Sequence, residues 1–420
     1  MKKNLMSSIL RNQRGAVAVI VGISIFMLVG FGALAVDIGH LHVARNELQN
    51  AADAGALAGA RVLYNDDGTA VNTGANQEAY DAATANKSEG TAVEVNWSGG
   101  NDGDVQRGHW SFGLAGLERG FYPNASTTPV DLWNVSTADL DANLNFINAV
   151  RVVTRRTTQG TPVASFFARI FGHENFELSA EAVGYIGFAG TLMPGDVDQP
   201  IAICSDTLLN DSGEYTCNIG RMINSGVDAE TNETGGWTSF DQTDDPCSGG
   251  TNSVEIKSLV CSDGNPEELM LGEPMETTGG EVQVAFDALR ACWDSETGTT
   301  QLWPLTLPVI DCGDENNVGT CEEIVGAVEL NIVWITGGGE DPLYKDAPTQ
   351  MDEWSNSDPD GVARWNDFVT YFNLVNADGT PAPYAKKSIY FLPDCTPHEP
   401  KGVSGGENFG ILAKIPVLVQ

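Results

Sequence analysis

The sequence predicts an α+β protein in which a long N-terminal helix crosses a membrane, continues outside it beside an antiparallel sheet, and is followed by a β-rich, disulfide-containing domain. Three observations predict this order. Residues 15–36 form an uncharged apolar run, residues 41–63 repeat small and apolar residues at helical spacing, and every cysteine lies after residue 200. The expected parts are a basic cytoplasmic tail (1–14), a transmembrane helix (15–36), a helix with an α+β domain (37–190) and a cysteine-containing extracytoplasmic domain (200–420).

The apolar run GAVAVIVGISIFMLVGFGALAV is long enough to cross a membrane. At roughly 1.5 Å per residue, a helix of this length spans the roughly 30 Å hydrocarbon core of a bilayer. The tail before it contains four basic residues and no acid: Lys2, Lys3, Arg11 and Arg14. By the positive-inside rule, this asymmetry predicts a single-pass protein of the bacterial cytoplasmic (inner) membrane, with its N-terminus inside and its bulk in the periplasm or at the cell surface.

A cleavable secretory signal with a small-residue site at residues 33–35 is the alternative. The apolar run exceeds the roughly 7–15 residues of a signal core, and the chain continues as a helix beyond it. We therefore expect the anchor to be retained.

The exported part is strongly acidic. Of the 22 Lys and Arg residues, four precede the span, so 18 remain against 57 Asp and Glu, and this part carries a net charge of −39. Such a surface repels phosphate groups, which argues against nucleic acid or anionic lipid headgroups as partners.

The segment from residue 41 to residue 63 lacks proline and is rich in strong helix formers. Eight of its small and apolar residues are predicted to form a helix interface: Leu41, Ala44, Leu48, Ala51, Gly55, Ala58, Gly59 and Val62. Small residues let another backbone approach closely. The stripe packs either on its own domain or on a partner, and the sequence leaves both open.

Several motifs around this helix resemble those of one known family. They are RGAVAV at 14–19, AVDIGH at 35–40, ARNELQNAADAGALAGA at 44–60, and NAVRVVTRR, SFFARIFG and LSAEAVGY between 148 and 187. Together they are similar to the Tad-like Flp pilus-assembly family, the TadE/TadG-like single-pass membrane proteins.

The resemblance implies a non-enzymatic, membrane-anchored component of a Flp/Tad-type (type IVb) pilus, acting in tight adherence. It also implies a pilin-like helix whose partners are other pilus-assembly membrane proteins or pilins. Members processed after a glycine carry Glu at the fifth following residue, whereas counting from Ala16 that residue here is Ile20. Cleavage after Gly15 is therefore not predicted.

Beyond the helix, alternation bounded by turn residues predicts strands at 91–97, 105–112, 149–157 and 176–186. Pro162 and Gly172 fit the start and stop of a helix. Residues 66–76 are expected to form a loop. The Pro- and Gly-containing stretch 192–199 is the expected domain boundary. In the second domain we expect strands at 200–204, 328–336, 388–392 and 410–419, and a helix at 362–374.

All eight cysteines lie after residue 200, in the part expected to be exported: Cys204, Cys217, Cys247, Cys261, Cys292, Cys312, Cys321 and Cys395. An even number outside the cytoplasm predicts up to four disulfides, whose connectivity the sequence leaves open. A metal site is the alternative, but no C-x-x-C pair occurs.

The sequence contains no H-E-x-x-H motif and no P-loop. His40 and His42 are two residues apart on a helix and do not face each other. One segment has the form of a calcium-binding EF-hand loop, with ligand candidates Asn356, Asp358, Asp360 and Asp367. Asp358 or Asp360 can equally cap a helix. Calcium is the single cofactor the sequence suggests.

The sequence is compatible with three functions. Pilus assembly is favoured; a surface adhesin with an outer ligand-binding domain and an exported enzyme with a dispersed site are the alternatives.

Overall fold

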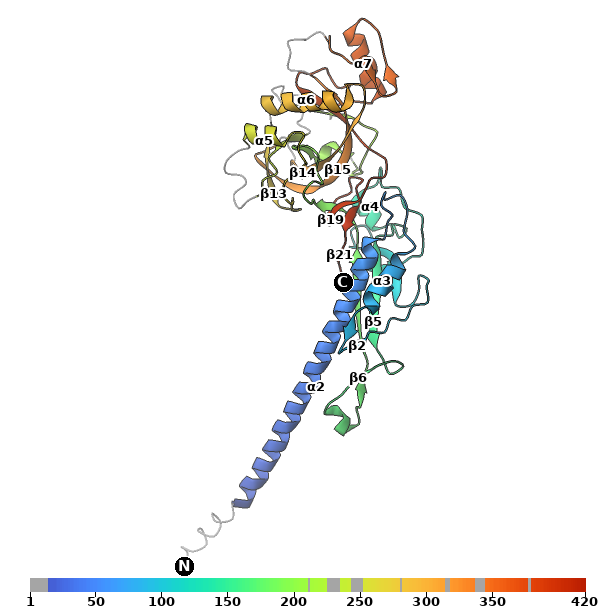
Figure 1. Cartoon of the computed structure of the whole chain (residues 1–420), viewed down its shortest axis with the longest axis vertical. Coiled ribbons are helices and arrows are strands. Elements are labelled where there is room, and N and C mark those ends of the chain that lie inside the picture. The colour runs from blue at the N-terminus through green and yellow to red at the C-terminus, as the bar shows by residue number, and fades with distance from the viewer. Residues whose placement is uncertain are drawn as a thin grey trace, which may run out of the picture.

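A computed structural model describes residues 14–210, 212–224, 235–242, 252–279, 282–313, 318–336, 344–376 and 379–420. A single helix, α2 (Arg14–Arg61), forms a rod that carries two lobes at its C-terminal end (Figure 1). The predicted continuity of span and outer helix is therefore confirmed. It is the one described helix that is long and apolar enough to cross a membrane, and its apolar stretch makes no contact with the lobes over most of its length.

The lobe next to the rod contains a five-stranded antiparallel sheet in the order β21-β8-β5-β3-β4. Its strands are β3 (Val105–Ser111), β4 (Gly120–Pro123), β5 (Ala149–Arg156), β8 (Leu178–Tyr185) and β21 (Val417–Leu418). The second half of α2 and the helix α3 (Ala75–Thr84) pack against this sheet. Val150, Val152 and Ala182 are fully buried there, because alternate residues of each strand face the helices.

Three predicted strands of this lobe are confirmed as β3, β5 and β8, within two residues at each end. The strand expected at 91–97 is shorter, since β2 (Thr91–Ala92) pairs only with β1 (Lys87–Ser88). The helix α3 begins inside the predicted loop. The lobe also contains the short helix α4 (Thr137–Asp141).

The helix expected from Pro162 to Gly172 is wrong. The segment is a hairpin of β6 (Val163–Ala164) and β7 (Asn175–Phe176), with a 3₁₀ turn, η1 (Ala168–Phe171), at its tip. Its apolar residues do not form a buried stripe, since Phe166, Ile170 and Phe171 are all exposed. An isolated segment this short gains too little from backbone hydrogen bonds to remain helical without a packed face.

The outer lobe contains a seven-stranded sheet in the order β11-β18-β15-β13-β12-β10-β14. Its strands are β10 (Ile201–Cys204), β11 (Arg221–Asn224), β12 (Gly235–Thr238), β13 (Pro274–Thr278), β14 (Trp303–Asp311), β15 (Cys321–Ile335) and β18 (Ser388–Pro393). Because β14 also pairs with β15, five of these strands close into a ring. Every pairing in the sheet is antiparallel except that of β10 with β14.

Helices and two short strands complete the outer lobe: α5 (Ser253–Leu259), α6 (Gln283–Thr297), α7 (Gly361–Tyr371), β16 (Gln350–Met351) and β17 (Trp354–Ser355). Aromatic rings fill the core, as where Trp293 of α6 meets Trp334 of β15 edge to face with ring centroids 5.1 Å apart. The predicted helix at 362–374 corresponds to α7, and the strands predicted at 200–204, 328–336 and 388–392 correspond to β10, β15 and β18.

The end of the chain returns to the first lobe. β19 (Lys401–Gly406) pairs with β9 (Phe188–Thr191) and with β20 (Ala413–Ile415), and β21 then joins β8. The single strand expected at 410–419 is thus two strands in two sheets, divided at Pro416, which has no N–H to donate to a ladder. The three-stranded sheet β20-β19-β9 therefore lies at the junction of the two lobes, and Gly410 forms a bridge to Val328 of β15 in the outer sheet.

Three disulfides are present among the described residues: Cys204–Cys312, Cys217–Cys395 and Cys261–Cys292. All three link segments of the outer lobe. Cys321 begins β15, and Cys247 lies outside the described residues.

Candidate functional site

The small-residue stripe of α2 lies against the protein's own first lobe. Ala44, Leu48 and Ala51 are fully buried, and Gly55 and Gly59 are buried with them. Leu41, Ala58 and Val62 are half-buried. The structure thus places most of the predicted interface in an internal contact, and the half-buried three at its margin.

The two glycines of the stripe are sites of close approach. A Cβ on Gly55 would lie 2.8 Å from the carbonyl oxygen of Ala79 and 2.9 Å from the Cβ of Ala83. A Cβ on Gly59 would lie 2.8 Å from that of Ala79. The stripe therefore seats α3 directly on α2. A neighbouring row that was not predicted from the sequence, Ala52, Ala56 and Ala60, is equally buried and belongs to the same core.

A buried acid that was not predicted from the sequence lies just after the apolar run of α2. Asp37, one residue past the apolar run, is buried and accepts backbone N–H bonds from Phe166, Phe167 and Ala168 at 2.6–3.2 Å. Burial by itself raises the pKa of this carboxyl, but the three N–H donors and His40 outweigh it and hold the pKa below its ordinary value. Asp37 thus joins the start of the outer helix to the hairpin tip.

His40 and His42, which follow the apolar run of α2, differ in their contacts and exposure. His40 pairs with Glu89, and its ring lies 4.7 Å, between centroids, from that of Phe166. His42 is exposed on another side of the helix. They share no ligand, and the described residues contain no group of three or more His, Cys, Asp or Glu side chains that could hold a metal.

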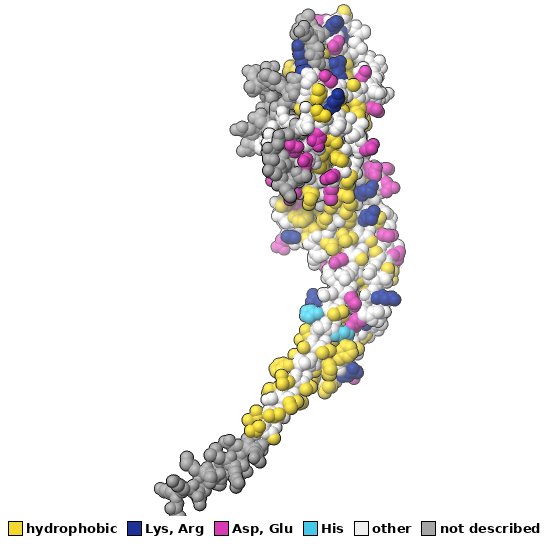
Figure 2. All heavy atoms as spheres, turned by 60° about the vertical axis from the view of Figure 1, so that its left-hand side comes forward, with side chains coloured by type: hydrophobic (Ala, Val, Ile, Leu, Met, Phe, Trp, Pro, Cys, Tyr) yellow, Lys and Arg dark blue, Asp and Glu magenta, His cyan; other side chains and the backbone are white. Residues whose placement is uncertain are grey.

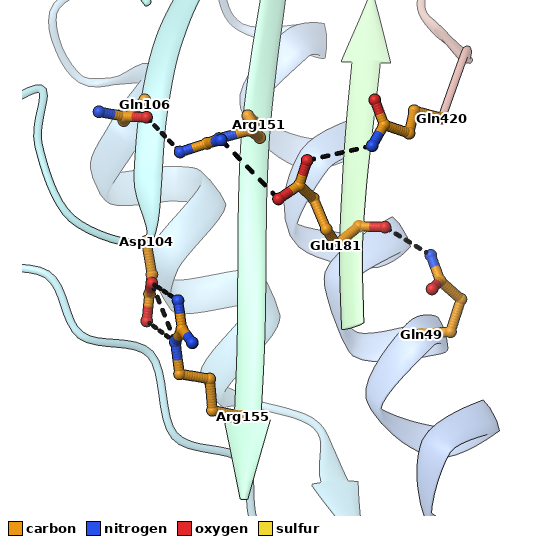
Figure 3. Close-up of polar contacts among 7 residues, drawn as sticks. All are labelled: Gln49, Asp104, Gln106, Arg151, Arg155, Glu181 and Gln420. Carbon is orange, nitrogen blue, oxygen red and sulfur yellow. Dashed lines mark hydrogen bonds and ion pairs between the residues drawn. The ribbon is translucent and has the colours of Figure 1, made fainter. Parts of the chain in front are cut away.

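A polar surface lies where the sheet meets the middle of α2 (Figure 3). Arg155 forms a two-pronged pair with Asp104, with nitrogen–oxygen distances of 2.7–3.1 Å. Arg151 lies 3.8 Å from Glu181, whose carboxylate and backbone oxygens accept hydrogen bonds from Gln420 and Gln49 respectively. The C-terminal residue, the sheet and α2 are thereby linked through one side chain, Glu181.

We expect the two arginines of this surface to differ in their effect on stability. The Asp104 side chain is only 6% exposed, so Arg155→Ala leaves a buried carboxylate with one backbone donor, from Asn96. We expect the free energy of unfolding to fall by about 1–3 kcal/mol. Arg151→Ala removes a longer pair whose acid is 35% exposed, and we expect a change below about 1 kcal/mol. Urea unfolding of the purified full chain checks both, and equal losses would contradict the assignment.

A second ion pair, in the outer lobe near the junction, makes stability depend on pH. The Nδ1 atom of His398 lies 3.1 Å from a carboxylate oxygen of Glu329 on β15. Burial acts to lower the pKa of His398, but the hydrogen bond and charge of Glu329 and the Asp394 carbonyl outweigh it and raise the pKa above 6.5. A raised pKa in the folded state gives stability that is complete below pH 6.5 and is lost as the pH rises through the folded value. We expect thermal melts to show this loss in the wild type and to lack it in Glu329→Gln.

The predicted calcium loop is used for turns and a helix cap. Asn356, Asp358 and Asp360 each accept the backbone N–H two residues ahead, and Asp360 thereby caps α7 at Val362. Asp367 accepts from the side chains of Trp354 and Asn356. The four oxygen-bearing side chains thus all accept hydrogen bonds from N–H donors. Calcium binding remains a prediction, and the arrangement favours the capping alternative.

Comparison with known protein families gives two matches. Residues 15–62 match the Flp pilus-assembly TadE/G-like model, and residues 58–183 match the Tad-like Flp pilus-assembly model. The first covers the apolar run and the outer half of α2; the second covers the end of α2 and the first lobe's sheet except β21 and the last two residues of β8. No curated protein and no solved structure matches the chain.

Proposed function

We propose, from the premise that residues 15–183 belong to the Tad-like Flp pilus-assembly family, that this protein is a single-pass membrane component of pilus assembly with a structural, non-enzymatic role. Its N-terminus lies in the cytoplasm, residues 15–36 cross the inner membrane, and both lobes lie outside. The disulfides of the outer lobe and the basic tail support this orientation.

The observation that carries the proposal is the division of α2 into two halves. The half before Asp37 exposes apolar residues all round, as a membrane-spanning helix does, whereas the half after it buries one face against the first lobe. Because one unbroken helix joins them, the lobes cannot turn independently of the span. A neighbouring pilin or assembly protein that packs on the span would therefore hold the lobes in a fixed direction.

The division of α2 at Asp37 also indicates which of its surfaces is open to a partner helix. Most of the small-residue stripe is occupied by α3 and the sheet. The span itself, with Gly22 and Gly30 open on its surface, is the part of α2 left for another membrane helix.

Deletion of the coding region tests the role. Loss of pilus fibres supports assembly; intact fibres with poor attachment would support an adhesin, and no effect on either would support an exported enzyme. Complementation with the full chain restores fibres, whereas residues 37–420 exported behind a cleavable signal do not. Restoration by the unanchored form would overturn the requirement for the span.

A further inference from the structure

The hairpin β6–η1–β7 extends from the first lobe alongside α2, toward the N-terminus of the rod (Figure 1). Its tip lies at the height of Asp37, because that side chain accepts the N–H groups of Phe166, Phe167 and Ala168. The uncharged run of α2 ends at Val36, so the tip lies where the span leaves the hydrocarbon.

The tip exposes apolar side chains that nothing in the described chain covers. Ile170 and Phe171 are each 76% exposed and Phe166 is 50% exposed. Figure 2 shows hydrophobic side chains beside the rod next to those of the span, with few acidic side chains among them. On the neighbouring turn of α2, Leu34 and Val36 are also exposed. The apolar surface of the hairpin is therefore continuous with that of the span.

The hairpin is held at this depth by specific contacts. The carboxylate of Asp37 satisfies three N–H groups of the turn, and the ring of Phe166 lies against His40. The turn closes at Gly172 in the left-handed conformation, with φ of 90°. Arg169, the basic residue of the tip, is exposed among the apolar ones.

We propose that this hairpin is a second membrane contact, with Ile170 and Phe171 inserted into the outer leaflet at the boundary between headgroups and acyl chains. Aromatic and aliphatic side chains bind at this boundary, and a basic side chain among them reaches the phosphate layer. The occupant of the surface is lipid, because the exposed face adjoins the membrane-spanning face of α2. The contact fixes the tilt of the rod and the distance of the lobes from the bilayer. This inference rests on the proposed insertion of residues 15–36.

Tryptophan quenching tests it in the purified full chain reconstituted into phosphatidylcholine vesicles. All nine native tryptophans lie at residue 97 or later, outside both the span and the hairpin. Phe171→Trp therefore adds a reporter at the tip, Leu28→Trp adds one in the middle of the span, and Tyr371→Trp adds one on α7 of the outer lobe. All three native side chains are exposed, so the substitutions leave the core unchanged. The quenchers are lipids with bromine either near the headgroup or near the chain end.

The added emission of Phe171→Trp is expected to be blue-shifted and mostly lost with bromine near the headgroup, and less affected by bromine near the chain end. Leu28→Trp shows the reverse order, and Tyr371→Trp is quenched by neither lipid. If Leu28→Trp is quenched but Phe171→Trp behaves like Tyr371→Trp, the hairpin inference is overturned while the anchor stands. If Leu28→Trp is not quenched, the membrane span itself is refuted.

Discussion

Gly55→Leu is expected to destabilise the first lobe by about 3 kcal/mol, because overpacking a well-filled contact forces backbone to move. The new side chain would begin 2.8 Å from the Ala79 carbonyl oxygen and 3.3 Å from Val152, so neither α3 nor β5 can remain in place. Chemical unfolding of the full chain in detergent, followed by near-ultraviolet circular dichroism, measures the loss.

The matched control is Gly39→Leu on the same helix. Nothing lies within 4 Å of a Cβ at Gly39, and leucine has a higher helix propensity than glycine, so we expect no loss of stability. An equal effect at both positions would mean that α2 does not pack on the lobe through the small-residue stripe.

Removing the Cys204–Cys312 disulfide by the double change to serine is expected to cost the outer lobe about 4–5 kcal/mol, on the loop-entropy account of cross-links. The bond closes a loop between residues 108 apart and ties the end of β10 to the residue after β14. The bond therefore stabilises the parallel pairing of β10 with β14. Two parallel strands cannot be joined by a tight turn, so this pairing has no short local connection.

The Cys261–Cys292 bond provides the comparison, since its cysteines are only 31 residues apart. The same account predicts a loss of about 3–4 kcal/mol for that double serine variant. Urea unfolding of the two variants should rank them in this order. The reverse order would show that local packing, rather than restriction of the unfolded chain, decides the contribution of each bond.

The sequence sufficed for the features that depend on local pattern. The length and lack of charge of residues 15–36 predicted a helix long and apolar enough to cross a membrane, and alternation predicted β5 and β8 because alternate residues of each strand pack against the helices. Helical spacing found α7 for the same reason.

Features that depend on distant segments were missed. The segment from Pro162 to Gly172 was predicted as a helix because these two residues suit the start and stop of one, whereas it lies in a hairpin whose apolar side chains are exposed. The division of residues 410–419 between two sheets depends on strands more than 200 residues earlier, such as β8 and β9. Turn-forming residues in the sequence could not indicate that the end of the chain pairs with strands of the first lobe.

The contacts between α2 and the first lobe were predictable only in part, because some of them involve residues that are distant in the sequence. Gly55 and Gly59 stood out because small residues at helical spacing signal close approach. Asp37 was not predicted to join α2 to the hairpin, because the N–H groups that it accepts belong to residues 166–168, about 130 positions away. The pairing of Arg155 with Asp104 likewise joins two strands that are separated in sequence.

We infer that one helix lies half in the membrane and half in the exported lobe. Protease added to intact spheroplasts that express the full chain provides the decisive test. Both lobes are expected to be digested from outside, and a short N-terminal fragment containing residues 1–36 is expected to remain protected. Protection of the whole chain, or a mature protein that begins near Val36, would contradict it.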